Sequence, residues 1–127
     1  MTTGTQTQVE AVMSQPIETI SQRATVREAA TRMREHDFSA LLAPGGETGI
    51  VTSTDVLGVV ADGRDPESVT VADVMTAPVE SVTAEMRLGE AAAMMTNYGI
   101  KHMPVRDSDG DYVGMISSTD VQEVLGE

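Results

Sequence analysis

The sequence predicts an α+β fold built from two βαββα-type repeats related by pseudo-twofold symmetry and packed through their sheets. The main observation is internal similarity: residues 9–43 align without a gap onto 71–105 at an offset of 62, and residues 49–55 align onto 114–120 at an offset of 65. Each copy also places helical apolar periods between short extended runs. A repeat this short cannot bury its apolar face alone, so the two copies are expected to pack on each other.

The repeats set the expected domain boundaries. Residues 1–8 contain neither an apolar nor a basic run and are expected to form a disordered tail. Residues 9–63 form the first repeat and residues 64–127 the second, and together they make one domain. Each repeat opens with a Val-x-x-Val-Met turn, Val9 to Met13 or Val71 to Met75, followed by a proline and an extended stretch over 17–20 or 79–82.

Two helices are expected in each repeat. The first has apolar residues at i, i+3, i+4 and i+7, which predicts burial of Val26, Ala29, Ala30 and Met33, and of Leu88, Ala91, Ala92 and Met95. Thr25 and Glu28 form a capping-box start, of which the second copy keeps only the glutamate, Glu90. The last helix of each repeat has one apolar face, made by Val56, Val59 and Val60 or by Val121, Val124 and Leu125.

Two strands are expected between the helices of each repeat. They cover 39–43 and 48–51 in the first copy, and 101–105 and 112–116 in the second. Turns rich in glycine, proline and aspartate join them, Pro44-Gly45-Gly46 and Asp107-Ser108-Asp109-Gly110.

The charge balance is strongly acidic. Twenty acidic residues face seven arginines and one lysine, Lys101, for a net charge of -12. Such a surface repels phosphodiester backbones, so no nucleic-acid partner is expected. Two interpretations of the acidity are open: a surface like those of proteins from salt-loving organisms, or an ordinary acidic cytosolic protein. The longest apolar runs are far shorter than the roughly 18 residues that span a bilayer, so membrane insertion is not expected. A cytoplasmic location is expected instead.

The halophile-like interpretation predicts stabilisation by salt. The Debye length falls from about 10 Å at 0.1 M to about 3 Å at 1 M, which screens the self-repulsion of the acidic surface. We expect the melting temperature to rise over this range of NaCl. A flat or falling curve would remove the halophile-like interpretation.

Three motifs carry the resemblance that follows. Two of them occur in both repeats in the same order, and the third is found in the second repeat. They are Val-Met-x-x-Pro at the start of each copy, His102-Met103-Pro104-Val105 before the second turn, and Gly-[Ile/Met]-[Val/Ile]-[Thr/Ser]-x-x-Asp before the last helix. With this layout the chain resembles the cystathionine-β-synthase (CBS) domain pair over about residues 9–125.

The resemblance implies a regulatory module rather than an enzyme. Such pairs bind an adenosine-containing ligand, AMP, ADP, ATP or S-adenosylmethionine, in the cleft between the repeats, need no further cofactor, and transmit a conformational change to a partner protein. The resemblance also implies a homodimer whose contact face is formed by the helices. The alternative is a ligand-free scaffold for dimerisation or interaction. The retention of both Asp55 and Asp120 argues against this alternative.

A hydroxyl followed three residues later by a carboxylate occurs in each copy, as Thr52 with Asp55 and as Ser117 with Asp120. By spacing alone this is a helix cap, which satisfies backbone donors and complements the helix dipole. A helix start also offers N–H groups to a phosphate. The resemblance implies that these four residues contact ribose and phosphate, which is compatible with the cap.

The strand before each hydroxyl makes the two half-sites unequal. The second copy has Lys101 and His102, and the resemblance implies that they reach ligand phosphate. The first copy has Ser39 and Ala40 there. The site with Ser117 is therefore expected to favour phosphate, and the site with Thr52 to be weaker or to prefer a less anionic ligand.

The extended segments after each methionine are expected to flank the adenine. Each would come from the repeat opposite to the aspartate that holds the ribose. The expected flanking residues are Ser14, Ile17 and Glu18 in one segment, and Thr76, Val79 and Glu80 in the other. The two glutamates would repel a triphosphate and tolerate a cationic group such as a sulfonium, which keeps S-adenosylmethionine open.

Other site types are not favoured. Asp107, Asp109 and Asp111 lack the bidentate glutamate that a calcium loop needs, so an ordinary turn is expected. His36 and His102 do not have a metal-ligand spacing and there is no cysteine, so no metal site is expected. Four of the nine methionines, Met33, Met95, Met103 and Met115, are at expected core positions, so core packing is favoured over a metal role. No nucleophile–base pair is evident, and no catalytic residue is predicted.

Overall fold

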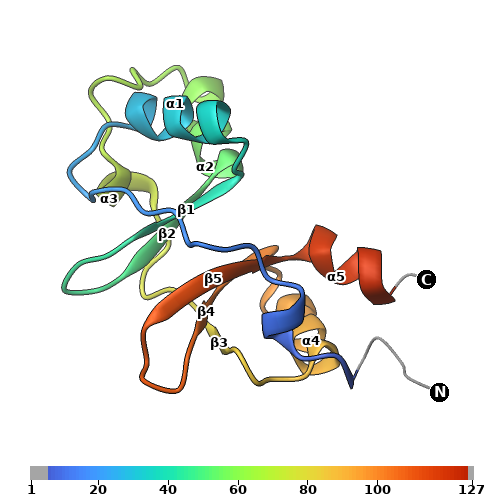
Figure 1. Cartoon of the computed structure of the whole chain (residues 1–127). Coiled ribbons are helices and arrows are strands. Elements are labelled where there is room, and N and C mark those ends of the chain that lie inside the picture. The colour runs from blue at the N-terminus through green and yellow to red at the C-terminus, as the bar shows by residue number, and fades with distance from the viewer. Residues whose placement is uncertain (1–5, 126–127) are drawn as a thin grey trace. The chain divides into compact units, whose positions relative to one another are not determined.

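The fold is α+β, as the repeat predicts. A computed structural model describes residues 6–125 (Figure 1). The elements in chain order are η2 (Val9–Ala11), α1 (Val26–His36), β1 (Ala40–Ala43), β2 (Gly49–Thr52), α2 (Ser53–Ala61), α3 (Val71–Val74), β3 (Val82–Thr83), α4 (Leu88–Tyr98), β4 (His102–Arg106), β5 (Tyr112–Ser117) and α5 (Ser118–Leu125). No helix in this described part is both long and apolar enough to span a membrane.

The chain forms two compact units that do not follow the repeat boundaries. Unit 2 is Glu18–Val79, and unit 1 combines the chain up to Ile17 with the chain from Glu80. The segment that opens each repeat thus belongs to the unit that holds the helices and strands of the other repeat. The repeat boundaries at 9–63 and 64–127 remain a prediction from the sequence.

Unit 2 is built on a two-stranded antiparallel sheet. Strand β1 pairs with β2 from Ala40 opposite Thr52 to Ala43 opposite Gly49. The extended chain at Thr19 runs parallel to β1, with Ile20 N–H donating to the Leu42 carbonyl at 2.8 Å. Helices α1 and α2 lie side by side and both reach the sheet (Figure 1).

Unit 1 repeats this plan with a three-stranded sheet. Strand β3 runs parallel to β4, and β4 pairs antiparallel with β5. Helices α4 and α5 contact each other, and α5 follows directly from the end of β5 (Figure 1).

Each hydrophobic core uses residues from both repeats. Val9 is fully buried in the unit 1 core, with Val12 and Met13 packed against it, although all three precede the first repeat's helices. Val71 is fully buried in the unit 2 core, joined by Val74 and Met75. This exchange is how two short repeats bury their apolar faces, as the length argument requires.

The predicted helix periods are confirmed at most positions. Val26, Ala29, Met33, Leu88, Ala91 and Met95 are buried as predicted. Ala30 and Ala92 are only half-buried, so their predicted burial is wrong. The Thr25 hydroxyl caps α1 by accepting from Glu28 N–H at 3.1 Å, while α4 has only the reverse bond, from Arg87 N–H to Glu90 at 3.4 Å.

Two further burial predictions need correction. Val60 was expected on the inner face of α2 but is 60% exposed, because Val59 is the residue that turns inward and is only 2% exposed. The position after a buried residue is rotated about 100° around the helix, which carries Val60 to the outer side. Met115 is half-buried rather than in the core. Within the predicted tail, the Thr7 carbonyl accepts from Leu88 N–H at 2.7 Å, and residues 1–5 lie outside the described residues. The tail itself stays a prediction.

Candidate ligand site

A hydroxyl–carboxylate cap begins the last helix of each repeat. In unit 1, Asp120 N–H donates to Ser117 Oγ at 3.1 Å, and Ser117 N–H donates to Asp120 Oδ2 at 3.0 Å. In unit 2, Asp55 N–H donates to Thr52 Oγ1 at 3.4 Å, and Thr52 N–H donates to Asp55 Oδ2 at 2.8 Å. The local capping interpretation is therefore confirmed. Both caps use Oδ2, so Oδ1 of each aspartate takes no part in them.

The strand beside each cap has the same backbone bonds and pairing in both units, but its side chains differ. Ser118 N–H donates to the Lys101 carbonyl at 2.8 Å, and Ser53 N–H donates to the Ser39 carbonyl at 2.9 Å. His102 pairs with Ser117 across the sheet, as Ala40 pairs with Thr52. The structure thus brings Lys101 and His102 to the cap of unit 1 and Ser39 to the cap of unit 2. Lys101 and Ser39 are exposed, and His102 is half-buried.

The environment of His102 disfavours its protonated form. Burial lowers the pKa of His102 below the ordinary value of 6.5, and the positive charge of Lys101 lowers it too, while the Asp120 carboxylate acts in the opposite direction. His102 is therefore mainly neutral at neutral pH. A bound phosphate would add a negative charge and raise this pKa.

This pKa shift predicts a loss of stability in mild acid. Between the lowered folded-state pKa and 6.5 the unfolded chain binds more protons at this position, so the contribution of His102 is complete above 6.5 and is lost as the pH falls below it. We expect His102→Gln to flatten the decline in melting temperature between about pH 7 and pH 5. His36→Gln, at an exposed histidine, is the control. An unchanged decline in His102→Gln contradicts this assignment.

The exchanged segments run beside the caps. In unit 1, Ser14 N–H donates to the Met115 carbonyl at 2.8 Å and Met115 N–H donates back at 3.0 Å. In unit 2, Thr76 and Ile50 exchange two bonds of 2.9 Å each. Met115 and Ile50 lie two residues before the capping hydroxyls, Ser117 and Thr52. Each cap is thus next to a segment from the opposite repeat. That these segments flank an adenine stays a prediction.

The last residue of each predicted adenine-flanking segment belongs to a different unit from the rest of that segment. Ile17 lies with Ser14 in unit 1, and Val79 with Thr76 in unit 2, where Val79 N–H donates to the Thr48 carbonyl at 2.9 Å. Glu18, however, belongs to unit 2, and its carbonyl accepts from Leu42 N–H at 2.9 Å. Glu80 belongs to unit 1. The unit boundaries thus fall inside the two predicted segments, and the role of Glu18 and Glu80 beside the adenine stays a prediction.

A glycine lies at each crossing of segment and strand. A Cβ on Gly114 would stand 2.7 Å from Met13 Sδ and 2.8 Å from the Ser14 carbonyl oxygen. A Cβ on Gly49 would stand 2.6 Å from Met75 Sδ and 3.1 Å from the Thr76 carbonyl oxygen. The exchanged segments reach the strands only because these positions have no side chain. Both glycines are part of the repeated motif before the last helix, but the motif spacing alone does not indicate this close approach.

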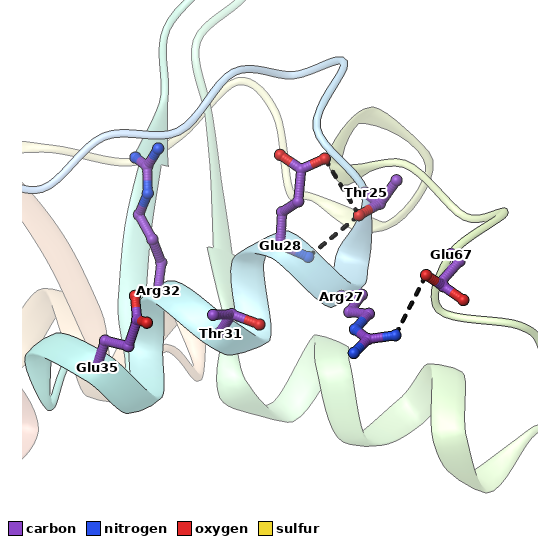
Figure 2. Close-up of a pocket in the computed structure, with 7 residues that line it drawn as sticks. All are labelled: Thr25, Arg27, Glu28, Thr31, Arg32, Glu35 and Glu67. Carbon is purple, nitrogen blue, oxygen red and sulfur yellow. Dashed lines mark hydrogen bonds and ion pairs between the residues drawn. The ribbon is translucent and has the colours of Figure 1, made fainter.

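A pocket of 490 Å³ lies elsewhere, along α1 in unit 2 (Figure 2). Its lining consists of Thr25, Arg27, Glu28, Thr31, Arg32, Glu35 and Glu67 and includes no predicted site residue. Arg27 forms an exposed ion pair with Glu67 at 3.2 Å, and Arg32 donates to the Thr19 carbonyl. Ligand pockets are mostly apolar with a few polar groups, whereas five of the seven residues that line this one are charged and the other two are threonines, so we do not assign a ligand to it.

The acidic hairpin between β4 and β5 is explained by its own bonds. Carboxylate oxygens of Asp107, Asp109 and Asp111 lie within 4.8 Å of one another. Asp107 Oδ1 accepts from Asp109 N–H at 2.9 Å and from Asp111 N–H at 3.0 Å, which closes the turn. This supports the interpretation as a turn.

Comparison with known proteins identifies the class. The family model of the CBS domain matches residues 9–62 and 71–127. A hexameric CBS-CP12 protein from bloom-forming cyanobacteria shares 30% identity with a TM-score of 0.88, over 94% of this chain and 71% of that one. The CBS domain pair of protein MJ0100, solved in complex with 5′-methylthioadenosine and S-adenosylmethionine, shares 27% identity with a TM-score of 0.84, over 94% and 96% of the two chains.

The fold and these matches define a tandem CBS pair, and the chain belongs to the CBS domain family. Among curated relatives, an uncharacterised protein of Methanopyrus kandleri, MK0525, is 33% identical over 104 residues, which cover 79% of this chain and 53% of that protein. The chain thus spans about half the length of this relative.

Proposed function

We propose that the protein is a regulatory module that senses an adenosine-containing ligand. The observation that carries the proposal is the meeting, in each unit, of a capped aspartate, a strand end and a segment from the opposite repeat. Oδ1 of Asp120 or Asp55 accepts bonds from ribose hydroxyls, since the cap uses Oδ2. The backbone of the exchanged segment reads the edge of the base. Ile17 and Val79, both half-buried, provide apolar contact.

The helix start in unit 1 has limited room for phosphate. Of its first-turn amides, that of Ser118 is bonded to the Lys101 carbonyl and that of Asp120 to Ser117 Oγ. Among the hydrogen bonds described for this turn, the Thr119 N–H is left for a phosphate oxygen. The charge of Lys101 and a hydrogen bond from His102 supply the remaining stabilisation. This arrangement suits one or two phosphate groups better than three, particularly with Glu80 in the same unit.

The site in unit 2 suits a less anionic ligand. It has Ser39 and Ala40 in place of Lys101 and His102, and Glu18 belongs to this unit. A carboxylate near the ligand favours a cationic sulfonium over a phosphate chain. The complex of the MJ0100 pair with S-adenosylmethionine and 5′-methylthioadenosine supports this choice, because neither compound carries a phosphate. We propose AMP or ADP for unit 1 and a sulfur-containing adenosine compound for unit 2.

Signalling follows from the exchanged segments. A ligand that bonds to the backbone near Ser14 or Thr76 holds a segment of one repeat against the strands of the other, which gives bound and free states different free energies. We propose that a partner protein detects this difference, that the module is a homodimer through its helices, and that it acts in the cytoplasm without catalysing a reaction.

The direct test is mass spectrometry of small molecules released from the purified protein by gentle denaturation. Release of an adenosine compound in an amount near one molecule per occupied site, that is, one or two per chain, supports the proposal. The matched control is a variant with both Asp55→Ala and Asp120→Ala, which should release none. If no adenosine compound is released or shifts the melt at any salt concentration, the ligand-sensing proposal fails and the scaffold alternative replaces it.

A further inference from the structure

A methionine side chain holds the exchanged segment onto the strand in unit 1. Met13 N–H donates to the Val9 carbonyl at 3.0 Å and so ends the opening turn. The next residue, Ser14, exchanges its two backbone bonds with Met115. At the same crossing the Met13 side chain lies on Gly114, since its Sδ is 2.7 Å and its Cγ 3.0 Å from the position that a Cβ would take there. The segment therefore contacts β5 through its backbone and through a thioether.

Unit 2 has the same arrangement. Met75 N–H donates to the Val71 carbonyl at 2.8 Å, and the next residue, Thr76, exchanges two backbone bonds with Ile50. Met75 Sδ is 2.6 Å and its Cγ 2.9 Å from the position of a Cβ on Gly49. We call the packing of methionine on glycine in each unit a methionine contact.

The two methionines are accessible to a small oxidant. The chain has nine methionines and no cysteine, so thioethers are its only sulfur groups. Met13 and Met75 are half-buried, whereas Met33, Met95 and Met103 are buried in the cores. A buried side chain is shielded from an oxidant that arrives in solvent. Hydrogen peroxide therefore reaches the methionine contacts more readily than it reaches the cores.

A sulfoxide does not fit a methionine contact. Oxidation converts the apolar thioether into a polar group with a new hydrogen-bond acceptor. The N–H groups of Ser14 and Met115 already donate to each other's carbonyls, at 2.8 and 3.0 Å, and those of Thr76 and Ile50 do the same at 2.9 Å each. A polar oxygen that is buried without a donor disfavours the folded arrangement. Water can hydrate the sulfoxide once the side chain leaves its glycine, and that movement loosens the segment.

We propose that Met13 and Met75 are sites of reversible oxidation by hydrogen peroxide, which releases the exchanged segments from the strands. A lone pair of Sδ attacks one peroxide oxygen, and the S–O bond forms as the O–O bond breaks. The leaving hydroxide takes the proton from the transferred oxygen and departs as water. The sulfur loses two electrons, and the peroxide gains them. Methionine sulfoxide reductases, one for each sulfur epimer, return the thioether; two thiols supply the electrons and become a disulfide, and the oxygen leaves as water.

Titration of the ligand-free protein with hydrogen peroxide tests the proposal. Peptide mass spectrometry measures oxidation at each methionine, while thermal melts and hydrogen exchange at the Ser14 and Thr76 amides measure the contacts. As Met13 and Met75 each gain one oxygen, we expect the melting temperature to fall by about 3–6 °C and both amides to exchange faster. The two reductases with dithiothreitol should restore both values. Complete oxidation of Met13 and Met75 without these changes overturns the proposal, as does failure of the reductases to restore them.

Two variants separate the methionine contacts from general oxidative damage. The double variant Met13→Leu with Met75→Leu keeps an apolar side chain of similar volume without sulfur, so its melting temperature should not change in peroxide. Met94→Leu is the matched control, because Met94 is half-buried against the unit 1 core but lies on α4 rather than on an exchanged segment. This control should lose stability in peroxide as the wild type does. Equal losses in the double variant and the wild type overturn the proposal.

A further variant gives an answer without peroxide, even if the leucine variant does not fold. Met13→Gln places an amide carbonyl near the position of the sulfoxide oxygen. It should lower the melting temperature and speed hydrogen exchange at Ser14, and an unchanged melt with unchanged exchange contradicts the proposal. All of these measurements use the ligand-free protein, so their outcome does not depend on the proposed adenosine ligand.

Discussion

Asp120→Ala is expected to abolish most of the stabilisation by an adenosine phosphate, and Asp55→Ala is expected to change it much less. A ligand at 100 times its dissociation constant stabilises the fold by about 2.7 kcal/mol. For a domain of this size that corresponds to a rise in melting temperature of about 5–10 °C. Loss of bonds to a charged group costs about 1.5–3 kcal/mol, which is enough to remove the rise. Thermal melts with AMP and ADP give the measurement.

The comparison between the two aspartates depends on their matched surroundings. Both cap a helix with Oδ2, so the two alanine variants lose the same kind of cap, worth about 0.5–2 kcal/mol, in the absence of ligand. They differ in their neighbours, since Lys101 and His102 stand by Asp120 and Ser39 stands by Asp55. The change in melting temperature on adding ligand, rather than the melting temperature itself, is the readout. Equal losses of this change in both variants would refute the proposed asymmetry.

Gly114→Ala is expected to destabilise the protein by about 1–3 kcal/mol, or roughly 3–10 °C in melting temperature. The new methyl group would lie 2.8 Å from the Ser14 carbonyl oxygen, which belongs to the backbone and accepts from Met115 N–H at 3.0 Å. Relief of the contact therefore requires displacement of the exchanged segment. We also expect ligand binding in unit 1 to weaken, because that segment forms one side of the proposed site.

Gly49→Ala and Gly46→Ala are the matched comparisons. At Gly49 the nearest backbone atom is 3.1 Å away and the closer contact is with the flexible end of Met75, so a smaller loss is expected. At Gly46 a Cβ would meet nothing within 4 Å, so the melting temperature should change little. A neutral Gly114→Ala variant would show that the segment near Ser14 is not held in the close approach described.

The site chemistry was largely accessible from the sequence because it is local. The bonds between Ser117 and Asp120 join residues three positions apart, and this spacing alone predicts a cap at a helix start. The inequality of the half-sites was equally visible, since repeat alignment places Lys101 and His102 against Ser39 and Ala40. Whether these residues bind a ligand stays a prediction.

The order of elements and the α+β class were determined by the sequence itself, because apolar periodicity and turn residues act over a few positions. Only the tertiary structure decided which repeat receives each opening segment at Ser14 and Thr76, which unit holds Glu18 and Glu80, and why Gly49 and Gly114 lack side chains. It also decided that Val59 rather than Val60 faces inward. Such choices depend on contacts between residues far apart in the chain, here Ser14 with Met115, whose free energy no local pattern records.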